Sequence, residues 1–337
     1  MYRIIIILLF VSKHIFAEEF DIAKSQNNHP SQTANTITEQ DYGKYKQWFT
    51  GPFFVPSPIS MSPQNPSVNP YIAGVCNYGN YDNNWHIHTA ESAMWSTQYG
   101  IYAMFGIVKG LGVDIVWQAS TNYRENVQST YFNDLIVRLG YQFLTDKKMK
   151  GDFTPNARII IQETFPTGKY NKLNSAKLNT DSMGQGSFQT GAYLAAEKEF
   201  FSKSKHPLNL YVSQGFFIPS VAHVKRLSCY GGNNFTNGKV YPGFVISSYF
   251  SGEVELSKHL NFAWDMSYLQ TLKGRFKGIE GTGDPVNISQ TVNFFIAPEL
   301  ELVFTEKAAL LIGPWATIIG QNTGAYVGLF LEFVYVF

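Results

Sequence analysis

Apolar and polar side chains alternate with a period of two residues along most of this chain, and this pattern constrains the fold more than any other feature. The final stretch shows it most clearly, because one face carries only apolar residues, namely Leu329, Leu331, Phe333, Tyr335 and Phe337. Gly328 and Glu332 lie on the opposite face. A two-residue period is that of a β-strand whose two faces meet different surroundings. The chain is therefore predicted to be all-β.

The composition indicates what those surroundings are. Hydrophobic residues make up 45% of the chain and charged residues only 15%, whereas a typical soluble domain carries roughly 25% charged residues. A transmembrane β-barrel explains the deficit, since each strand turns alternate side chains toward lipid. We expect a monomeric transmembrane antiparallel β-barrel, surrounded by the lipids of a bacterial outer membrane.

Counting the alternating stretches gives about twelve strands, an even number as expected for such barrels. They fall at 71–80, 93–107, 112–122, 131–144, 156–166, 186–200, 207–217, 243–256, 259–272, 289–304, 308–318 and 325–337. Short turns alternate with longer loops such as 167–185, 218–242 and 273–288. Short periplasmic and long external connections are typical of outer-membrane barrels, whereas a soluble β-sandwich has no reason to keep them in phase.

The chain begins with the features of an export signal. A positive charge precedes an unbroken apolar run, 4–11, that is too short to span a bilayer as a helix. We interpret 1–17 as a signal peptide. Residues 18–69 are polar and then proline-rich, which predicts an extended N-terminal periplasmic segment or a partial plug. The barrel domain is expected to cover 70–337.

Charge and cysteine content narrow the possible partners. The formal net charge is +1 and no basic cluster is present, so nucleic acid is excluded as a partner. Cys76 and Cys229 would meet an oxidising compartment after export, which permits a disulfide between them without requiring one. We expect no cofactor and no metal site.

Three strands end on a repeated pair of carboxylates, and the alternation places both members of each pair on the lumen face. The six residues are Glu197, Glu199, Glu253, Glu255, Glu299 and Glu301. Hairpin geometry predicts that they surround the periplasmic mouth of the barrel. One interpretation is a cation-attracting constriction. The other is a structural network, because unpaired burial would be costly. In it the carboxylates pair with inward-facing bases such as Arg138 and Arg158, or with turn lysines such as Lys203, Lys205 and Lys258.

Other positions extend this polar wall. The alternation turns four further charged residues toward the lumen, namely Asp114, Arg138, Arg158 and Asp265. Such a wall implies water or a polar solute inside the barrel. Tyrosines at 102, 193, 211 and 249 share the lumen face, where they could stack on a ring or a sugar, or fill space in a narrow barrel.

An enzymatic function finds little support in the sequence. His86 and His88 lie in or beside the first external loop. Some outer-membrane barrels that resemble lipases pair a His with a Ser two residues away, but neither His has Ser at that spacing. Two imidazoles without further placed ligands are weak evidence for a metal. We interpret the pair as part of a loop.

The C-terminal residues resemble the assembly signal of bacterial outer-membrane barrels, in which a terminal Phe follows further aromatic residues at alternate positions. Phe337, together with Phe333 and Tyr335, matches this pattern. The resemblance implies the barrel-assembly machinery as a partner.

A second resemblance lies in the stretch 157–170, ARIIIQETFPTGKY, followed after a polar loop by GQGSFQTGAYLAAEKEF. It is similar to the core motif of the outer-membrane family named for the meta-pathway of phenol degradation. The residues that match directly are Pro166, Thr167, Gly168, Lys169 and Tyr170. The resemblance covers 130–337 and implies a barrel with a loose link to the uptake of aromatic compounds.

Three functions follow from these observations. The leading hypothesis is a channel or uptake protein for small solutes, aromatic or cationic, that works by passive diffusion. A barrel of this size can also be nearly filled by its inward side chains, so the second hypothesis is a closed structural barrel that interacts through its external loops. A lipid-modifying enzyme is the remote third.

Overall fold

The computed structural model describes residues 49–146, 153–281 and 285–337. The predicted signal peptide at 1–17 and most of the predicted polar segment at 18–69 therefore lie outside the described residues.

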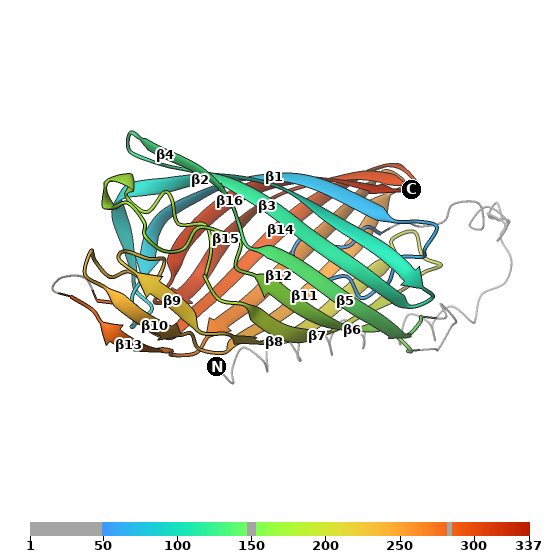
Figure 1. Cartoon of the computed structure of the whole chain (residues 1–337). Helices are drawn as coiled ribbons and strands as arrows, with labels where there is room; N and C mark the ends of the chain where they lie inside the picture. Colours follow the sequence, from blue (N-terminus) through green and yellow to red (C-terminus); the bar gives the residue numbers. More distant parts are fainter. Residues whose placement is uncertain (1–48, 147–152, 282–284) are drawn as a thin grey trace, which may run out of the picture. The chain divides into compact units, whose positions relative to one another are not determined.

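Twelve antiparallel strands form a closed barrel, as predicted (Figure 1). Each predicted strand overlaps one of them, because the two-residue alternation marks nearly every lipid-facing strand. The barrel strands are β1 (Ser67–Tyr81), β2 (Ile87–Val108), β3 (Leu111–Arg124), β5 (Leu135–Leu144), β6 (Asn156–Phe165), β7 (Gln189–Phe200), β8 (Leu208–Pro219), β11 (Val245–Ser257), β12 (Leu260–Thr271), β14 (Thr291–Thr305), β15 (Ala308–Gln321) and β16 (Gly324–Val336).

The first and last strands close the barrel. β1 pairs with β2 on one side and with β16 on the other, where Ser67 lies opposite Val336 and Tyr71 opposite Glu332. Closure removes the edges that an open sheet would present to lipid, where unpaired backbone groups are very costly. No helix among the described residues is long and apolar enough to cross a bilayer.

The last strand shows how the alternation divides lipid from lumen. Leu329 and Leu331 are 54% and 37% exposed on the outer face of β16. Phe330 and Glu332, on the intervening positions, are 1% and 5% exposed and face inward. The predicted two-faced strand is thus confirmed, with its apolar face turned outward.

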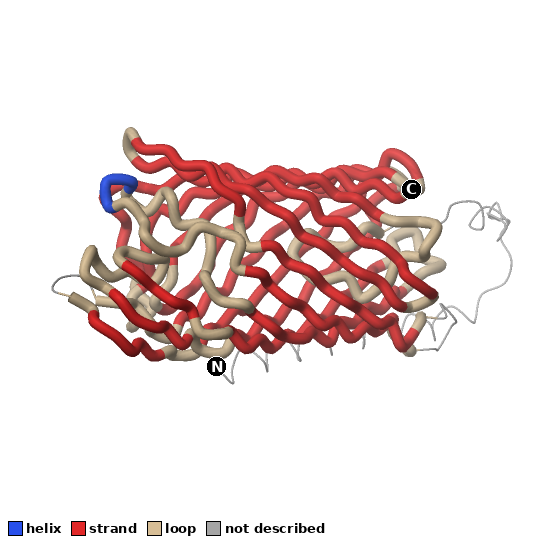
Figure 2. Tube along the Cα trace, in the orientation of Figure 1, coloured by secondary structure: helices blue, strands red, loops and turns tan. Residues whose placement is uncertain are grey.

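The external loops contain short strands that the sequence did not reveal (Figure 2). β4 (Val127–Phe132) extends the outer end of β3, and a separate three-stranded sheet joins β9 (Ala222–Lys225), β10 (Asn237–Tyr241) and β13 (Arg275–Ile279). This small sheet packs on a buried cluster of Ala222, Val224, Val240 and Val286. A 3-10 helix, η1 (Ser175–Lys177), lies in the loop between β6 and β7. The sequence predicts loops at 218–242 and 273–288, because strands of four or five residues are too short for a periodic pattern. The end of β4 falls within the predicted strand 131–144.

The turns between β2 and β3, β11 and β12, and β14 and β15 are short and share one end of the barrel with the C-terminus (Figure 1). We call this end periplasmic, because outer-membrane barrels carry their short turns there.

Candidate functional site

The lumen is the candidate site, and the segment before β1 occupies part of it. We call residues 49–66 the lumen segment. Its side chains and backbone contact inward-facing residues on opposite walls of the barrel. This part of 18–69 thus lies inside the barrel, while the role expected for the whole segment stays a prediction.

Two aromatic side chains fix the lumen segment to one wall. The ring of Phe53 stacks on Phe330 with 4.1 Å between centroids. The ring of Phe54 lies edge-on to Phe295, with centroids 4.8 Å apart, and also contacts Trp315. Such aromatic pairs contribute about 0.5–1.5 kcal/mol each beyond the area that they bury.

The backbone of the same two residues is bound by carboxylates. The amide of Phe54 donates a 2.7 Å hydrogen bond to Oδ2 of Asp265, and the amide of Phe53 donates a 3.3 Å bond to Oε2 of Glu299. Both carboxylates are almost completely buried. A backbone amide that is buried inside the barrel needs an acceptor of this kind. Asp265 and Glu299 thus hold the lumen segment in place.

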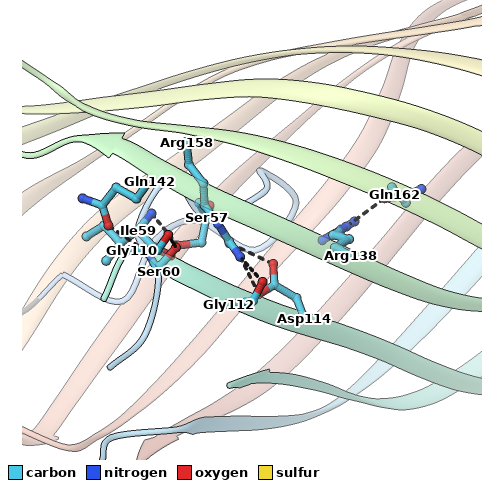
Figure 3. A network of polar contacts seen from close by, with 10 residues as sticks. All are labelled: Ser57, Ile59, Ser60, Gly110, Gly112, Asp114, Arg138, Gln142, Arg158 and Gln162. Carbon is cyan, nitrogen blue, oxygen red and sulfur yellow. Dashed lines mark hydrogen bonds and ion pairs between the residues drawn. The ribbon is translucent and has the colours of Figure 1, made fainter. Parts of the chain in front are cut away.

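The opposite wall binds the next part of the lumen segment (Figure 3). Nη1 of Arg158 donates to the carbonyl of Ser57 at 3.3 Å. The amide of Ser60 donates to Oε1 of Gln142 at 3.0 Å, and its hydroxyl donates to the carbonyl of Gly110 at 2.9 Å. The segment therefore bridges two walls and is not attached to one side only.

A buried ion pair organises this second wall. Arg158 on β6 binds Asp114 on β3 through both terminal nitrogens, at 2.9 and 3.0 Å, although β5 lies between the two strands (Figure 3). The guanidinium crosses β5 at Gly140, where a Cβ atom would overlap it. The sequence did predict both charges on the lumen face, but it gave no indication that they pair across a glycine.

The six paired glutamates do not form a ring. They lie on β7, β11 and β14, which are separated only by β8 and β12, so they occupy one arc of the wall. The ring was expected because hairpins were counted along the chain without their position around the barrel. Cross-strand pairing places Asn209 between Glu199 and Glu253, and Asn261 between Glu255 and Glu301.

Neutral donors contact three buried members of this arc. The hydroxyl of Tyr211 donates to Glu253 at 2.7 Å, the amide of Asn261 to Glu301 at 2.6 Å, and the amide of Asn156 to Glu197 at 2.8 Å. Arg158 pairs with Asp114 instead. A structural network is thus present, but among the described residues neither Arg138 nor Arg158, two of the bases expected to pair with the glutamates, does so. Glu253, Glu299 and Glu301 are at most 1% exposed, so they do not face an open pathway.

Arg138 has a different environment from Arg158. Its Nε donates to Oε1 of Gln162 at 2.8 Å, and its guanidinium lies 5.9 Å from the ring centroids of both Tyr102 and Tyr193. Among the described residues no carboxylate lies within 4.0 Å of it, whereas Arg158 has Asp114. Arg138 also lines a cavity of about 220 Å³ inside the barrel, next to Phe53 and Phe54 of the lumen segment.

The two cysteines are free. Cys76 lies on the same face of β1 as the exposed Ile72, which is the outer face. Cys229 lies in the external loops, where its amide donates to the carbonyl of Tyr170. The disulfide that the sequence permitted is therefore not formed. Burial, followed by the nearby charge of Asp134, raises the pKa of the Cys229 thiol to about 12.

The histidine pair has a carboxylate partner that sequence reasoning missed. Nε2 of His88 lies 3.0 Å from Oδ2 of Asp82, and Nδ1 of His86 lies 3.8 Å from the same oxygen. The hydrogen bond from His88 is the main reason why the pKa of Asp82 falls to about 2. Asp82 and His86 lie in the exposed β1–β2 connection and His88 lies at the start of β2. Their proximity in sequence was the signal that could have joined them. Within the described residues no group of three His, Cys, Asp or Glu could hold a metal ion.

The motif at 166–170 organises an external loop. The hydroxyl of Thr167 donates to the carbonyl of Asn133, and the amide of Gly168 donates to Asp134 at 2.8 Å. Nζ of Lys169 lies 2.6 Å from Asp181. Phe333 and Tyr335 lie on the outer face of β16, and their role with Phe337 in assembly stays a prediction.

Sequence reasoning missed Phe53, Phe54, Ser57 and Ser60 as lumen residues. The apolar triplet 53–55 between two prolines was the available signal.

Comparisons with known proteins place the fold. No family model matches the chain, so the resemblance to the phenol-degradation family is not confirmed, and no curated protein matches it either. The structure is similar to that of the COG4313 outer membrane channel from Pseudomonas putida F1, with a TM-score of 0.64 and 11% identity over 82% of this chain and 97% of that one. The translocator domain of the autotransporter NalP from Neisseria meningitidis gives a TM-score of 0.43 and 9% identity over 81% and 88%. The chain has the fold of a bacterial outer-membrane β-barrel.

Proposed function

We propose that this protein is an outer-membrane channel for the uptake of small solutes by passive diffusion. The observation that carries the proposal is the cavity of about 220 Å³ inside the barrel, bounded by both the wall and the lumen segment. A purely structural barrel has no need of such a space, since interiors are packed with few voids larger than a water molecule. Polar groups on both sides of the segment make a hydrated pathway feasible.

The lumen segment restricts this pathway. It is held by an aromatic cluster and by a small number of hydrogen bonds at its two walls. Solute passage through the centre of the barrel requires that some of these contacts loosen. Diffusion of this kind needs no cofactor, and specificity would come from the groups that line the cavity.

The arc of glutamates supports a structural role in this mechanism better than a selective one. Asp265 and Glu299 bind the backbone of the lumen segment. With their oxygens occupied or buried, they hold the segment and do not attract ions along an open route. We therefore do not propose a cation-selective constriction at this end of the barrel.

Planar-bilayer recordings of the full-length protein test the proposal. Replacing both Phe53 and Phe54 with Ala removes the aromatic anchors, so the mean conductance should rise several-fold over that of the unaltered protein. The matched control is Phe304→Ala, because Phe304 is 53% exposed on the lipid face of β14 and does not touch the segment. If neither the unaltered protein nor the Phe53/Phe54 variant conducts, the channel proposal is wrong.

A closed surface-interaction barrel is the second candidate. It is favoured by the external sheet β9–β10–β13, which has its own buried core, together with the occupied lumen. This candidate predicts no conductance in either variant, and it predicts loss of a surface interaction when the external sheet is removed.

A further inference from the structure

The cavity inside the barrel has a basic side chain at one side and an acidic side chain at the other. Arg138 on β5 and Glu332 on β16 both line it. β1, β2 and β3 lie between these two strands around the wall, and the two side chains are not within ion-pair distance of each other. A cavity with a guanidinium at one side and a carboxyl group at the other suits a ligand with two different polar ends.

The guanidinium of Arg138 is positioned to bind an anion. Gln162 binds its Nε, which leaves the fork of terminal nitrogens without a carboxylate among the described residues. A guanidinium is always charged and binds a planar carboxylate through two parallel hydrogen bonds. Burying it without a negative partner is costly, and Arg158, in the same wall, does have such a partner in Asp114. The contrast within one wall singles out Arg138.

The space between Arg138 and Glu332 suits one ring. Tyr71, Tyr102, Phe54 and Trp315 present aromatic faces or edges to the cavity. An apolar cavity of about 150 Å³ is large enough to bind benzene, so about 220 Å³ holds one ring with a small substituent at each end. Two fused rings with the same substituents would require the lumen segment to move.

We propose that the cavity binds a monoaromatic carboxylate that carries a hydroxyl or amino group at its far end, with the carboxylate on Arg138 and the donor on Glu332. This inference rests on the proposed channel function and names the solute class that the pathway would select. Neutral apolar rings lack the partner for Arg138, and cations would be repelled by it.

Calorimetric titration of the purified full-length protein in detergent, with 4-hydroxybenzoate as the probe, tests the site. We expect saturable binding of one molecule per barrel. Phenol, which keeps the ring and the hydroxyl but lacks the carboxylate, should bind at least about tenfold more weakly, since a hydrogen bond to a charged group typically contributes this much or more. Equal binding of the two compounds, or no saturable binding of 4-hydroxybenzoate, overturns the proposal.

Variants locate the binding to Arg138. Arg138→Gln should weaken 4-hydroxybenzoate binding at least about tenfold, and Arg138→Lys should weaken it less, because the charge remains but the planar fork is lost. The matched control is Arg275→Gln, since Arg275 also lies over a tyrosine ring, Tyr241, but belongs to the external sheet. Unchanged binding in Arg138→Gln contradicts the assignment. If that variant does not fold, the comparison of 4-hydroxybenzoate with phenol on the unaltered protein still tests whether the site binds a carboxylate.

The result is separable from that of the conductance test. If the barrel conducts but does not bind 4-hydroxybenzoate, this inference fails and the channel proposal stands. Binding in the absence of any conductance or uptake supports the site and contradicts the channel.

Discussion

Arg158 on β6 binds Asp114 on β3 across an intervening strand, with nitrogen–oxygen distances of 2.9 and 3.0 Å, and the same guanidinium donates to the backbone of Ser57. One buried side chain therefore connects the barrel wall to the segment inside it. Both partners are nearly inaccessible to water. The stability of the wall and the position of the lumen segment should consequently change together.

Breaking this pair from one side should be costly. Arg158→Gln leaves Asp114 buried without its cation, so we expect a loss of roughly 3–5 kcal/mol in the free energy of unfolding. Urea unfolding in lipid vesicles measures it. Replacing both residues with Leu should recover much of that loss, because no uncompensated charge remains. A double variant as unstable as the single one would argue against this explanation.

The glycine beneath the guanidinium should not tolerate a side chain. In Gly140→Ala the new methyl group overlaps Arg158, so the variant should lose about 1–3 kcal/mol of stability. Gly74→Ala is the control, since no atom lies within 4 Å of the position of its Cβ on the outer face of β1. The same unfolding assay compares them. Equal stability of the two variants would show that Arg158 does not cross the wall at this point.

A substitution at a second glycine, Gly106, should displace the lumen segment. A Cβ atom at Gly106 on β2 would overlap the backbone of Met61 and Ser62. Gly106→Val should therefore displace the segment and raise the conductance, while the barrel strands remain paired. Planar-bilayer recordings and circular dichroism measure the two effects. A folded variant with unaltered conductance would mean that this part of the segment does not limit the pathway.

The β1–β2 connection should respond to acid only at very low pH. The hydrogen bond from His88 favours the charged form of Asp82 and lowers its pKa to about 2 from an ordinary value of 3.8. The contact is therefore complete above about pH 4 and is lost as the pH falls toward 2. Carboxyl carbon NMR in micelles should show this low midpoint, and His88→Ala should raise it. A midpoint near 3.8 in the unaltered protein would disprove the contact.

Cys229 should be a poor nucleophile despite its place in the external loops. Its raised pKa, about 12, leaves almost no thiolate at pH 8. We expect maleimide labelling at pH 8 to be far slower than that of a cysteine introduced at Lys277 on the exposed face of β13. Labelling at similar rates would contradict the burial of this thiol.

The barrel could be predicted from the sequence because lipid and lumen impose opposite requirements on neighbouring residues. Leu329, Phe330 and Leu331 illustrate the limit of that signal, since Phe330 faces inward although it is apolar. It does so because Phe53 stacks on it, and Phe53 belongs to a segment with no periodic pattern. Contacts between the barrel wall and the lumen segment do not change the two-residue alternation of the strands, so the alternation does not predict them.

The charged residues show the same limit. The two-residue alternation correctly predicts that Asp114, Arg158 and Glu253 face the lumen, because the pattern within a single strand determines which side chains point inward. Their partners depended on register and on the order of strands around the barrel. The pair between Arg158 and Asp114 needs a glycine on the strand between them, and the partner of Glu253 is the hydroxyl of Tyr211 on β8. Such relations become visible only when the strands are aligned.

The position of the lumen segment is the central claim, and tethering it tests that claim most directly. With Cys76 and Cys229 replaced by Ser, cysteines at Ser60 and Gln142 should be joined by a short bismaleimide, because Ser60 of the lumen segment is hydrogen-bonded to Gln142 of the barrel wall. Cysteines at Ser60 and Lys277 provide the control pair. We predict that the first pair cross-links within one chain and that the tethered barrel conducts less than the untethered one. Failure to cross-link, or a conductance that tethering leaves unchanged, would contradict the account.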